Sequence, residues 1–238
     1  FFFKQKTAYE ISSRDWSSDV CSSDLALAAA SLWWSGSRSG WLLALGSGIA
    51  MAWMLPGLAR WRMGLTVAVI VGGAGVFVAR NAGYFEKGAT SATARMDYWK
   101  AAVQATGERP LLGHGPGTFM RPYSRLKRPE SEMARLVHND YLEQFCDSGI
   151  PGGLAYLAWV GSALGVAWVR HGRRGEPVMA GLLVGTTAWL GQGMTEFGLY
   201  VPALAWTGFA FLGWLAAVGG DLASTPGDGG SKDSGGVA

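Results

Sequence analysis

Long apolar blocks alternate with short charged links along most of this chain. Five blocks approach the roughly 20 residues that a helix needs to cross a bilayer, at 41–57, 64–79, 152–169, 178–195 and 199–218. The blocks are apolar on all sides, whereas the core helices of a soluble protein would each keep a polar face. Residues 26–34 are too few to span and are predicted to be the end of a truncated span. The pattern predicts an all-α polytopic membrane protein, a bundle of about five complete spans plus the truncated one.

The short links predict the orientation of the bundle. Arg60 and Arg62 lie in one link, and Arg170, Arg173 and Arg174 lie in another. Arginines in short links stay on the cytoplasmic side, whereas a long loop is poorly governed by its own charges. The predicted organisation is transmembrane helices at 26–79, one large outer loop with short helices at 80–151, transmembrane helices at 152–218 and a disordered cytoplasmic tail at 219–238.

Residues 1–25 do not fit this pattern. The strings Lys4-Gln-Lys-Thr-Ala-Tyr-Glu-Ile11 and Asp15-Trp-Ser-Ser-Asp-Val-Cys-Ser-Ser-Asp-Leu25 resemble the translation of a common short-read sequencing adapter. We therefore expect residues 1–25 to be an artefact, exclude them from the fold, and expect the native start to lie upstream. Without Cys21, Cys146 is the only cysteine, so we expect no intrachain disulfide and a small buried apolar role for Cys146.

The outer loop favours arginine over lysine, with seven arginines and three lysines. A guanidinium offers a planar fork that matches two phosphate oxygens at once, which an ammonium group cannot do. This bias suits a phosphorylated or pyrophosphorylated lipid. Nonspecific attraction to anionic headgroups explains the composition equally well.

His138 is the first candidate for chemistry in the loop. Its spacing from Leu142 and Phe145 predicts a helix with the histidine on an apolar face. Gly149 is expected to end that helix, and Pro151 suits the first turn of the next, membrane-spanning one. A histidine here can be a general base near neutral pH. A half-buried structural histidine is the alternative.

Three other features have plain interpretations. Gly113-His-Gly-Pro-Gly117 lacks the Lys-Ser/Thr of a nucleotide-binding loop, so a tight turn is expected, with His114 able to contact a ligand. Three histidines, with His171 predicted on the other side of the membrane, and one cysteine do not form a closed zinc site. Glu196, near the outer end of a span, is either functional or extended toward water.

Four features between about residues 90 and 155 together resemble the O-antigen ligase and polymerase family of bacterial envelope proteins. They are Arg95 with Trp99 four residues later, the turn Pro110-Leu-Leu-Gly-His-Gly-Pro-Gly-Thr-Phe119, the string His138-Asn-Asp-Tyr-Leu142, and the helix entry Gly149-Ile-Pro-Gly152. The flanking spans fit the C-terminal half of such proteins.

The resemblance implies an integral inner-membrane glycosyltransferase. Ligases of this family transfer a glycan from undecaprenyl pyrophosphate to the lipid A core on the periplasmic face. The implied catalytic residues are His138, which would activate the acceptor hydroxyl, and Arg95, which would neutralise the pyrophosphate. Weaker substrate-binding candidates are Arg121, Arg135 and His114. The implied partners are the lipid-linked glycan, its acceptor and membrane lipids; no metal, cofactor or nucleic acid is implied.

Other functions remain open. Polymerases of the family pass the glycan to another lipid-linked repeat unit, and the loop sequence does not separate them from ligases. A transporter would show broken helices and charges at the membrane midplane, which these spans lack; a noncatalytic polysaccharide-binding protein is a further alternative. The family has more spans and a further arginine in an earlier outer loop, so we expect the present polypeptide to be truncated and inactive.

Overall fold

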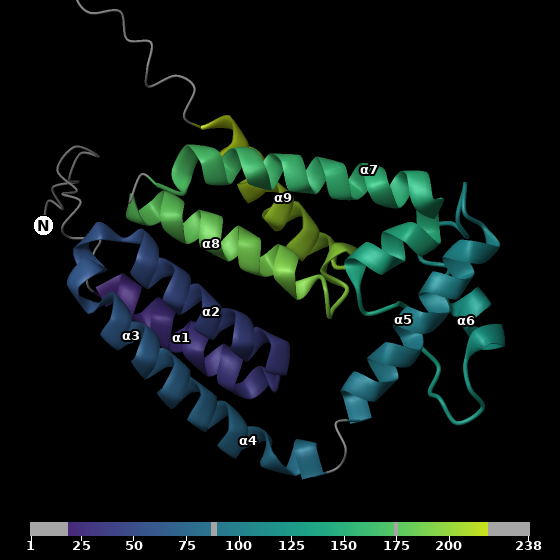
Figure 1. The fold of residues 1–238 in the computed structure, drawn as a ribbon, viewed down its shortest axis with the longest axis horizontal. Helices are drawn as coiled ribbons and strands as arrows, with labels where there is room; N and C mark the ends of the chain where they lie inside the picture. The colour runs from purple at the N-terminus through teal and green to yellow at the C-terminus, as the bar shows by residue number, and fades with distance from the viewer. Residues whose placement is uncertain (1–18, 87–89, 174–175, 219–238) are drawn as a thin grey trace, which may run out of the picture.

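The computed structural model describes residues 19–86, 90–173 and 176–218. Most of the adapter-like segment, and all of the tail predicted at 219–238, lie outside the described residues. All regular structure in the described ranges is helical, which confirms the predicted all-α class. The helices form a bundle with a smaller group of helices at one end (Figure 1).

The N-terminal helices form one side of the bundle. α1 (Asp19–Ser35) and α2 (Arg38–Met54) are followed by a nearly continuous helical run: η1 (Pro56–Trp61), α3 (Arg62–Ala68), the π-helical turn η2 (Val69–Gly73) and α4 (Ala74–Glu86). Ser37 caps α2 by accepting a hydrogen bond from the Gly40 N–H at 3.0 Å. α1 begins at Asp19, earlier than the predicted residue 26.

The C-terminal helices form the other side of the bundle. They are α7 (Asp140–His171), α8 (Pro177–Gln192) and α9 (Pro202–Ala217), with the short η3 (Gly198–Tyr200) before α9. α9 contacts both α7 and α8, and α2 packs against α8. Ala167, Leu183 and Leu215 form a buried apolar cluster between the three helices.

Two helical stretches are long and apolar enough to cross a membrane, namely Pro56–Gly83 and Asp140–His171. α9 is a shorter apolar helix, and α2 and α8 have 17 and 16 residues. A helix occupies each of the five predicted blocks, but the count of five spans and the orientation stay predictions.

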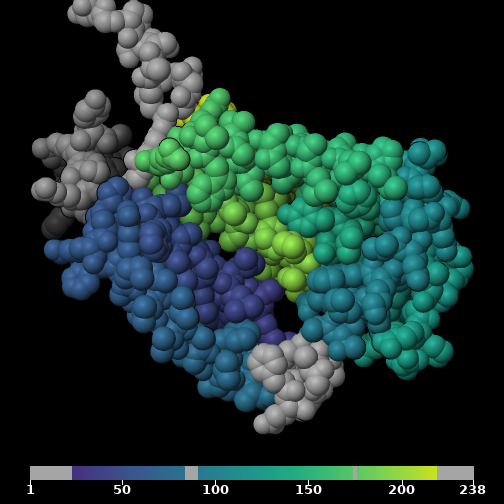
Figure 2. Space-filling view, in the orientation of Figure 1, coloured from purple at the N-terminus to yellow at the C-terminus, as the bar shows by residue number. Residues whose placement is uncertain are grey.

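The predicted outer loop folds into a compact group of helices. α5 (Thr90–Glu108), α6 (Met120–Leu126) and the first arm of α7 surround a separate apolar core. Small alanines on one face of α5 allow α7 to approach closely, while Phe119 and Tyr123 stack with ring centroids 5.2 Å apart. Cys146 is fully buried in this core, as predicted. Figure 2 shows the teal surface of this group against the right-hand end of the green α7.

A glycine-rich turn fixes a break in α7. Gly149 has φ 72° and ψ −176°, which divides α7 into a first arm and a second, apolar arm with Pro151 at its start. Gly113, Gly115 and Gly117 all have positive φ. The confirmed predictions are the tight turn at residues 113–117, the end of the first arm at Gly149 and the place of Pro151.

Main-chain hydrogen bonds join the turn to the break. The N–H groups of His114 and Gly115 donate to the carbonyls of Cys146 and Asp147 at 2.8 and 2.9 Å, and the Ile150 N–H donates to Pro110 O at 2.7 Å. The approach is so close that a Cβ on Gly113 would lie 2.4 Å from Asp147 O. This contact sets the direction of the first arm, and with it the position of the residues before Asp140.

Candidate active site

His138 lies just outside α7. Its φ of 55° is the only positive φ of a non-glycine residue in the described ranges. Asn139 is the N-cap, because its Oδ1 accepts from the N–H groups of Tyr141 and Leu142 at 3.1 and 3.0 Å. The prediction that His138 shares a helix face with Leu142 and Phe145 is therefore wrong: helical geometry begins only at Asp140, after the cap.

Aromatic side chains hold the His138 ring. Tyr98 on α5 stacks on it with ring centroids 5.8 Å apart, and Phe197 meets it edge-on at 4.8 Å. The Trp99 indole N–H donates to the His138 carbonyl at 3.4 Å. The side chain keeps 31% of its surface exposed, so one side of the ring is fixed and another stays accessible.

Glu196 links His138 to Arg95. Arg95 Nη2 lies 2.6 Å from Glu196 Oε1, and Arg95 Nε donates to the Thr195 carbonyl at 3.0 Å. The buried His138 Nδ1 lies 3.6 Å from Glu196 Oε2. The polar contact with His138, assisted by the positive charge of Arg95, lowers the pKa of Glu196 although burial opposes it. The carboxylate is thus ionised near neutral pH and faces two basic groups.

The link that carries Glu196 is fastened to the start of α7. The Asp140 N–H donates to the Gly193 carbonyl at 2.7 Å, and Asn139 Nδ2 donates to the Met194 carbonyl at 2.9 Å. The Tyr141 hydroxyl donates to the Leu190 carbonyl at 2.7 Å. These bonds join residues about 50 positions apart in sequence, and they bring the α8–α9 link to His138.

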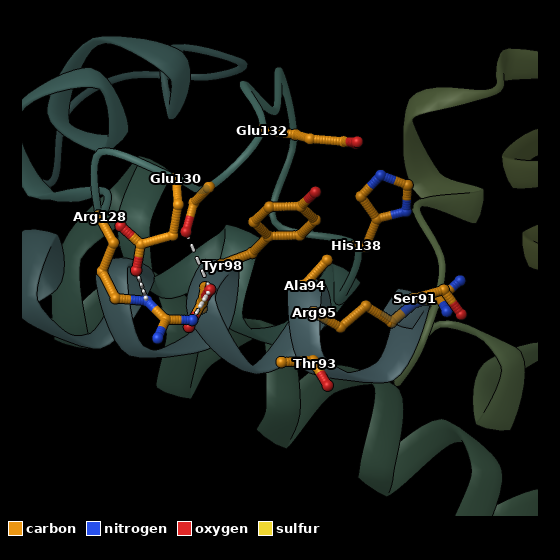
Figure 3. A pocket seen from close by; sticks show the side chains of 11 residues that line it. Ser91, Thr93, Ala94, Arg95, Tyr98, Arg128, Glu130, Glu132 and His138 are labelled. Carbon is orange, nitrogen blue, oxygen red and sulfur yellow. Dashed lines mark hydrogen bonds and ion pairs between the residues drawn. The ribbon is translucent and has the colours of Figure 1, made fainter. Parts of the chain in front are cut away.

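Arg95 and His138 line one cavity of about 600 Å³. Figure 3 shows Tyr98 between His138 and an ionic group at the other end of the cavity. There Arg128 contacts Asp97 at 2.5 Å and Glu130 at 3.6 Å. The hydrogen bond from Arg128 lowers the pKa of Asp97. Both arginines of this cavity therefore already face carboxylates.

Arg135 is the third predicted residue near this centre. With His138 and Phe197 it lines an adjoining cavity of about 420 Å³. The structure thus brings Arg95, His138 and Arg135 to one region of the group formed by α5, α6 and the start of α7.

Arg121 and His114 line a different cavity, of about 470 Å³, and no residue lining it also lines the two cavities beside His138. Arg109 and Arg125 lie there too, and Arg125 pairs with Glu108 at 2.8 Å. His114 Nε2 is 2.9 Å from the Ala105 carbonyl, so its ring is engaged with the main chain of α5. The structure therefore does not join Arg121 and His114 to the centre at His138.

Glu196, predicted to be either functional or extended toward water, lies beside His138 and Arg95, and Phe197 was not predicted to lie there. The sole signal for Glu196 was an acidic residue near the end of a predicted span. Its partner Arg95 lies 101 positions away in the chain, and no local pattern reports such a contact. No group of three His, Cys, Asp or Glu in the described ranges is placed to hold a metal ion.

The fold and site define a helical membrane-type protein with a histidine, a carboxylate and a guanidinium gathered at one end of its bundle. The chain belongs to the O-antigen ligase family, whose model matches residues 25–157, more than half of its length. This confirms the resemblance and indicates a membrane glycosyltransferase of the ligase or polymerase kind, acting on lipid-linked glycans. The matched range contains Arg95 and His138 and ends before Glu196. Comparison with curated proteins and with solved structures gave no match.

Proposed function

We propose that the protein transfers a glycan from undecaprenyl pyrophosphate to an acceptor sugar of the lipid A core, at the periplasmic face of the bacterial inner membrane. One observation carries the proposal: His138 and Arg95 line the same cavity and share Glu196, although they lie far apart in sequence. A base and a cation side by side are what transfer from a pyrophosphate to a hydroxyl requires.

In this reaction His138 is the general base. Its imidazole takes the proton of the acceptor hydroxyl, and the hydroxyl oxygen attacks the anomeric carbon of the donor glycan. The bond from that carbon to the pyrophosphate oxygen breaks, and the electron pair leaves with the pyrophosphate. Arg95 stabilises the negative charge that develops there, because a preorganised cation acts most strongly where charge appears in the transition state.

The remaining candidates are assigned to substrate binding. Arg135, in the adjoining cavity, is placed to contact a phosphate or the glycan near the reacting bond. Arg121 shares its cavity with two other arginines and one glutamate, so this cavity has an excess of positive charge suited to an anionic part of a substrate or membrane lipid. His114 contributes to the wall of that second cavity.

Substitution in the chromosomal gene of the source bacterium tests the proposal. We expect His138→Ala to lower glycan attachment to the lipid A core by about 10² to 10⁴, the usual contribution of a general base. Lipopolysaccharide is analysed on gels, with the protein level in membranes measured in parallel. Lys100→Ala is the matched control, because Lys100 is an exposed basic residue of α5 that lines none of these three cavities.

The outcomes separate the candidate functions. Normal attachment in the His138→Ala strain, at normal protein level, would exclude the catalytic role and favour transport or binding. Attachment of single repeat units in place of long chains would identify the protein as the polymerase, because the acceptor is then another lipid-linked repeat. Loss of attachment with accumulation of lipid-linked chains supports the ligase.

A further inference from the structure

We propose that Glu196 is a positioning residue. It determines which ring nitrogen of His138 carries the proton, and during the reaction its main ion pair changes from Arg95 to protonated His138. This inference rests on the proposed function. It assigns to the α8–α9 link a role in a centre whose other members belong to α5 and to the residues just before α7.

The first step concerns the imidazole. His138 Nδ1 is buried, has no hydrogen-bond partner in the described part of the chain, and lies 3.6 Å from Glu196 Oε2. An ionised carboxylate accepts hydrogen bonds and donates none, so it favours the tautomer with the proton on Nδ1. Nε2 then keeps its lone pair and is the atom that takes the acceptor proton. Tyr98 and Phe197 limit rotation of the ring, so the small movement that closes the gap to Glu196 keeps Nε2 directed away from the carboxylate.

The second step concerns charge. In the resting site the Glu196 carboxylate is 2.6 Å from Arg95 Nη2 and balances that guanidinium. When His138 gains a proton it becomes a second cation beside the same carboxylate. Attraction to the Glu196 carboxylate stabilises the imidazolium, and the ion pair between Glu196 and Arg95 weakens. The guanidinium is released toward the pyrophosphate in the step in which that group gains negative charge.

Other ionisable groups around the centre do not duplicate this role. Tyr98 stacks on the ring, Glu132 lines the cavity and Arg135 lines the adjoining one. The Asp140 carboxylate is turned to the Leu199 N–H, at 3.2 Å, and not to the imidazole. Glu196 is the carboxylate within ion-pair distance of both His138 and Arg95 in the described ranges.

The test is the pH profile of glycan transfer in membranes from strains with substituted chromosomal genes. Glu196→Gln keeps the size of the side chain and removes its charge, and we expect it to lower the rate at pH 7 by about 10- to 100-fold, as loss of an orienting partner does. The acidic limb of the profile should also move to lower pH, because the imidazolium loses its balancing charge and faces Arg95 uncompensated. Glu196→Asp keeps the charge and should retain the wild-type profile, with a rate closer to wild type.

The matched control is Glu176→Gln, the same substitution at the opposite end of α8, which should leave both rate and profile unchanged. Equal loss of rate in Glu196→Gln and Glu196→Asp, with an unchanged profile in both, would show a merely structural role and overturn the inference. If the Glu196→Gln protein does not accumulate in membranes, the pH profile of Glu196→Asp tests the inference, and a shift of its acidic limb would contradict the inference. Full activity of His138→Ala would instead overturn the proposed function itself, so the two failures are distinct.

Discussion

Gly149→Ala is expected to open the contact between the glycine-rich turn and α7. At φ 72° and ψ −176° the backbone occupies a region that is essentially restricted to glycine, and another residue there costs about 1–3 kcal/mol. The new Cβ would also lie 2.6 Å from the Leu111 carbonyl carbon and 2.7 Å from Pro110 O. Both are main-chain atoms that cannot rotate away, and the Ile150 hydrogen bond at 2.7 Å would be lost, at about 0.5–1.5 kcal/mol. The total is about 1.5–4.5 kcal/mol.

Cys146 reports this opening directly, because its thiol is fully buried and its carbonyl accepts from the His114 N–H of the turn. In a chain whose other cysteines are replaced by serine, we expect labelling of Cys146 by a maleimide to accelerate by about 10- to 10³-fold, since each 1.4 kcal/mol is a factor of ten. Gly161→Ala is the control: it lies in the second arm of the same helix with open space around its Cβ position, so it should not accelerate labelling. Equal labelling rates in the two variants would refute the reasoning.

Three further predictions concern the group formed by α5, α6 and the start of α7. Tyr123→Phe removes the hydrogen bond from the buried hydroxyl to the Glu132 carbonyl at 2.9 Å, so limited proteolysis between residues 127 and 136 should increase, in line with a loss of about 1–3 kcal/mol, while equal cleavage would contradict the assignment. Asn139→Ala removes the N-cap of α7 and the hydrogen bond to the Met194 carbonyl, a loss of about 1–2 kcal/mol in the free energy of unfolding. The thermal midpoint in detergent should fall by several degrees, and an unchanged midpoint would argue against the cap. The pKa of Asp97 is lowered, so its ion pair with Arg128 stabilises the fold above the ordinary carboxyl pKa of 3.8, and this stabilisation is lost as the pH falls through the lowered pKa. The difference in thermal midpoint between wild type and Arg128→Ala should therefore shrink in acid and stay constant from pH 5 to 7.

Local signals in the sequence were sufficient to predict where many of the helices and turns lie. The glycines at 113, 115 and 117 indicated a turn because only glycine adopts positive φ without cost, and Gly149 with Pro151 indicated where one helix ends and the next begins. The apolar blocks indicated helices, although Gly193 and Pro202 shorten α8 and α9 relative to the blocks from which they were predicted. These features depend on neighbours along the chain.

The site depended on contacts that no local pattern contains. Periodicity placed His138 on a helix face, whereas the preference of Asn139 for the N-cap position moves the helix start past it and leaves His138 with positive φ. Glu196 lies beside His138 only because hydrogen bonds hold the α8–α9 link against the start of α7. Arginine composition likewise did not show that Arg121 lies in a different cavity from Arg95.

The place of Glu196 in chain order has a consequence for biosynthesis. α5 and the start of α7 leave the ribosome before α8, so the nascent chain carries Arg95 and His138 before their common carboxylate exists. The centre is complete only when the link between α8 and α9 has docked on Asn139 and Asp140. A chain arrested after α7 would therefore hold Arg95 and His138 without the carboxylate that lies between them.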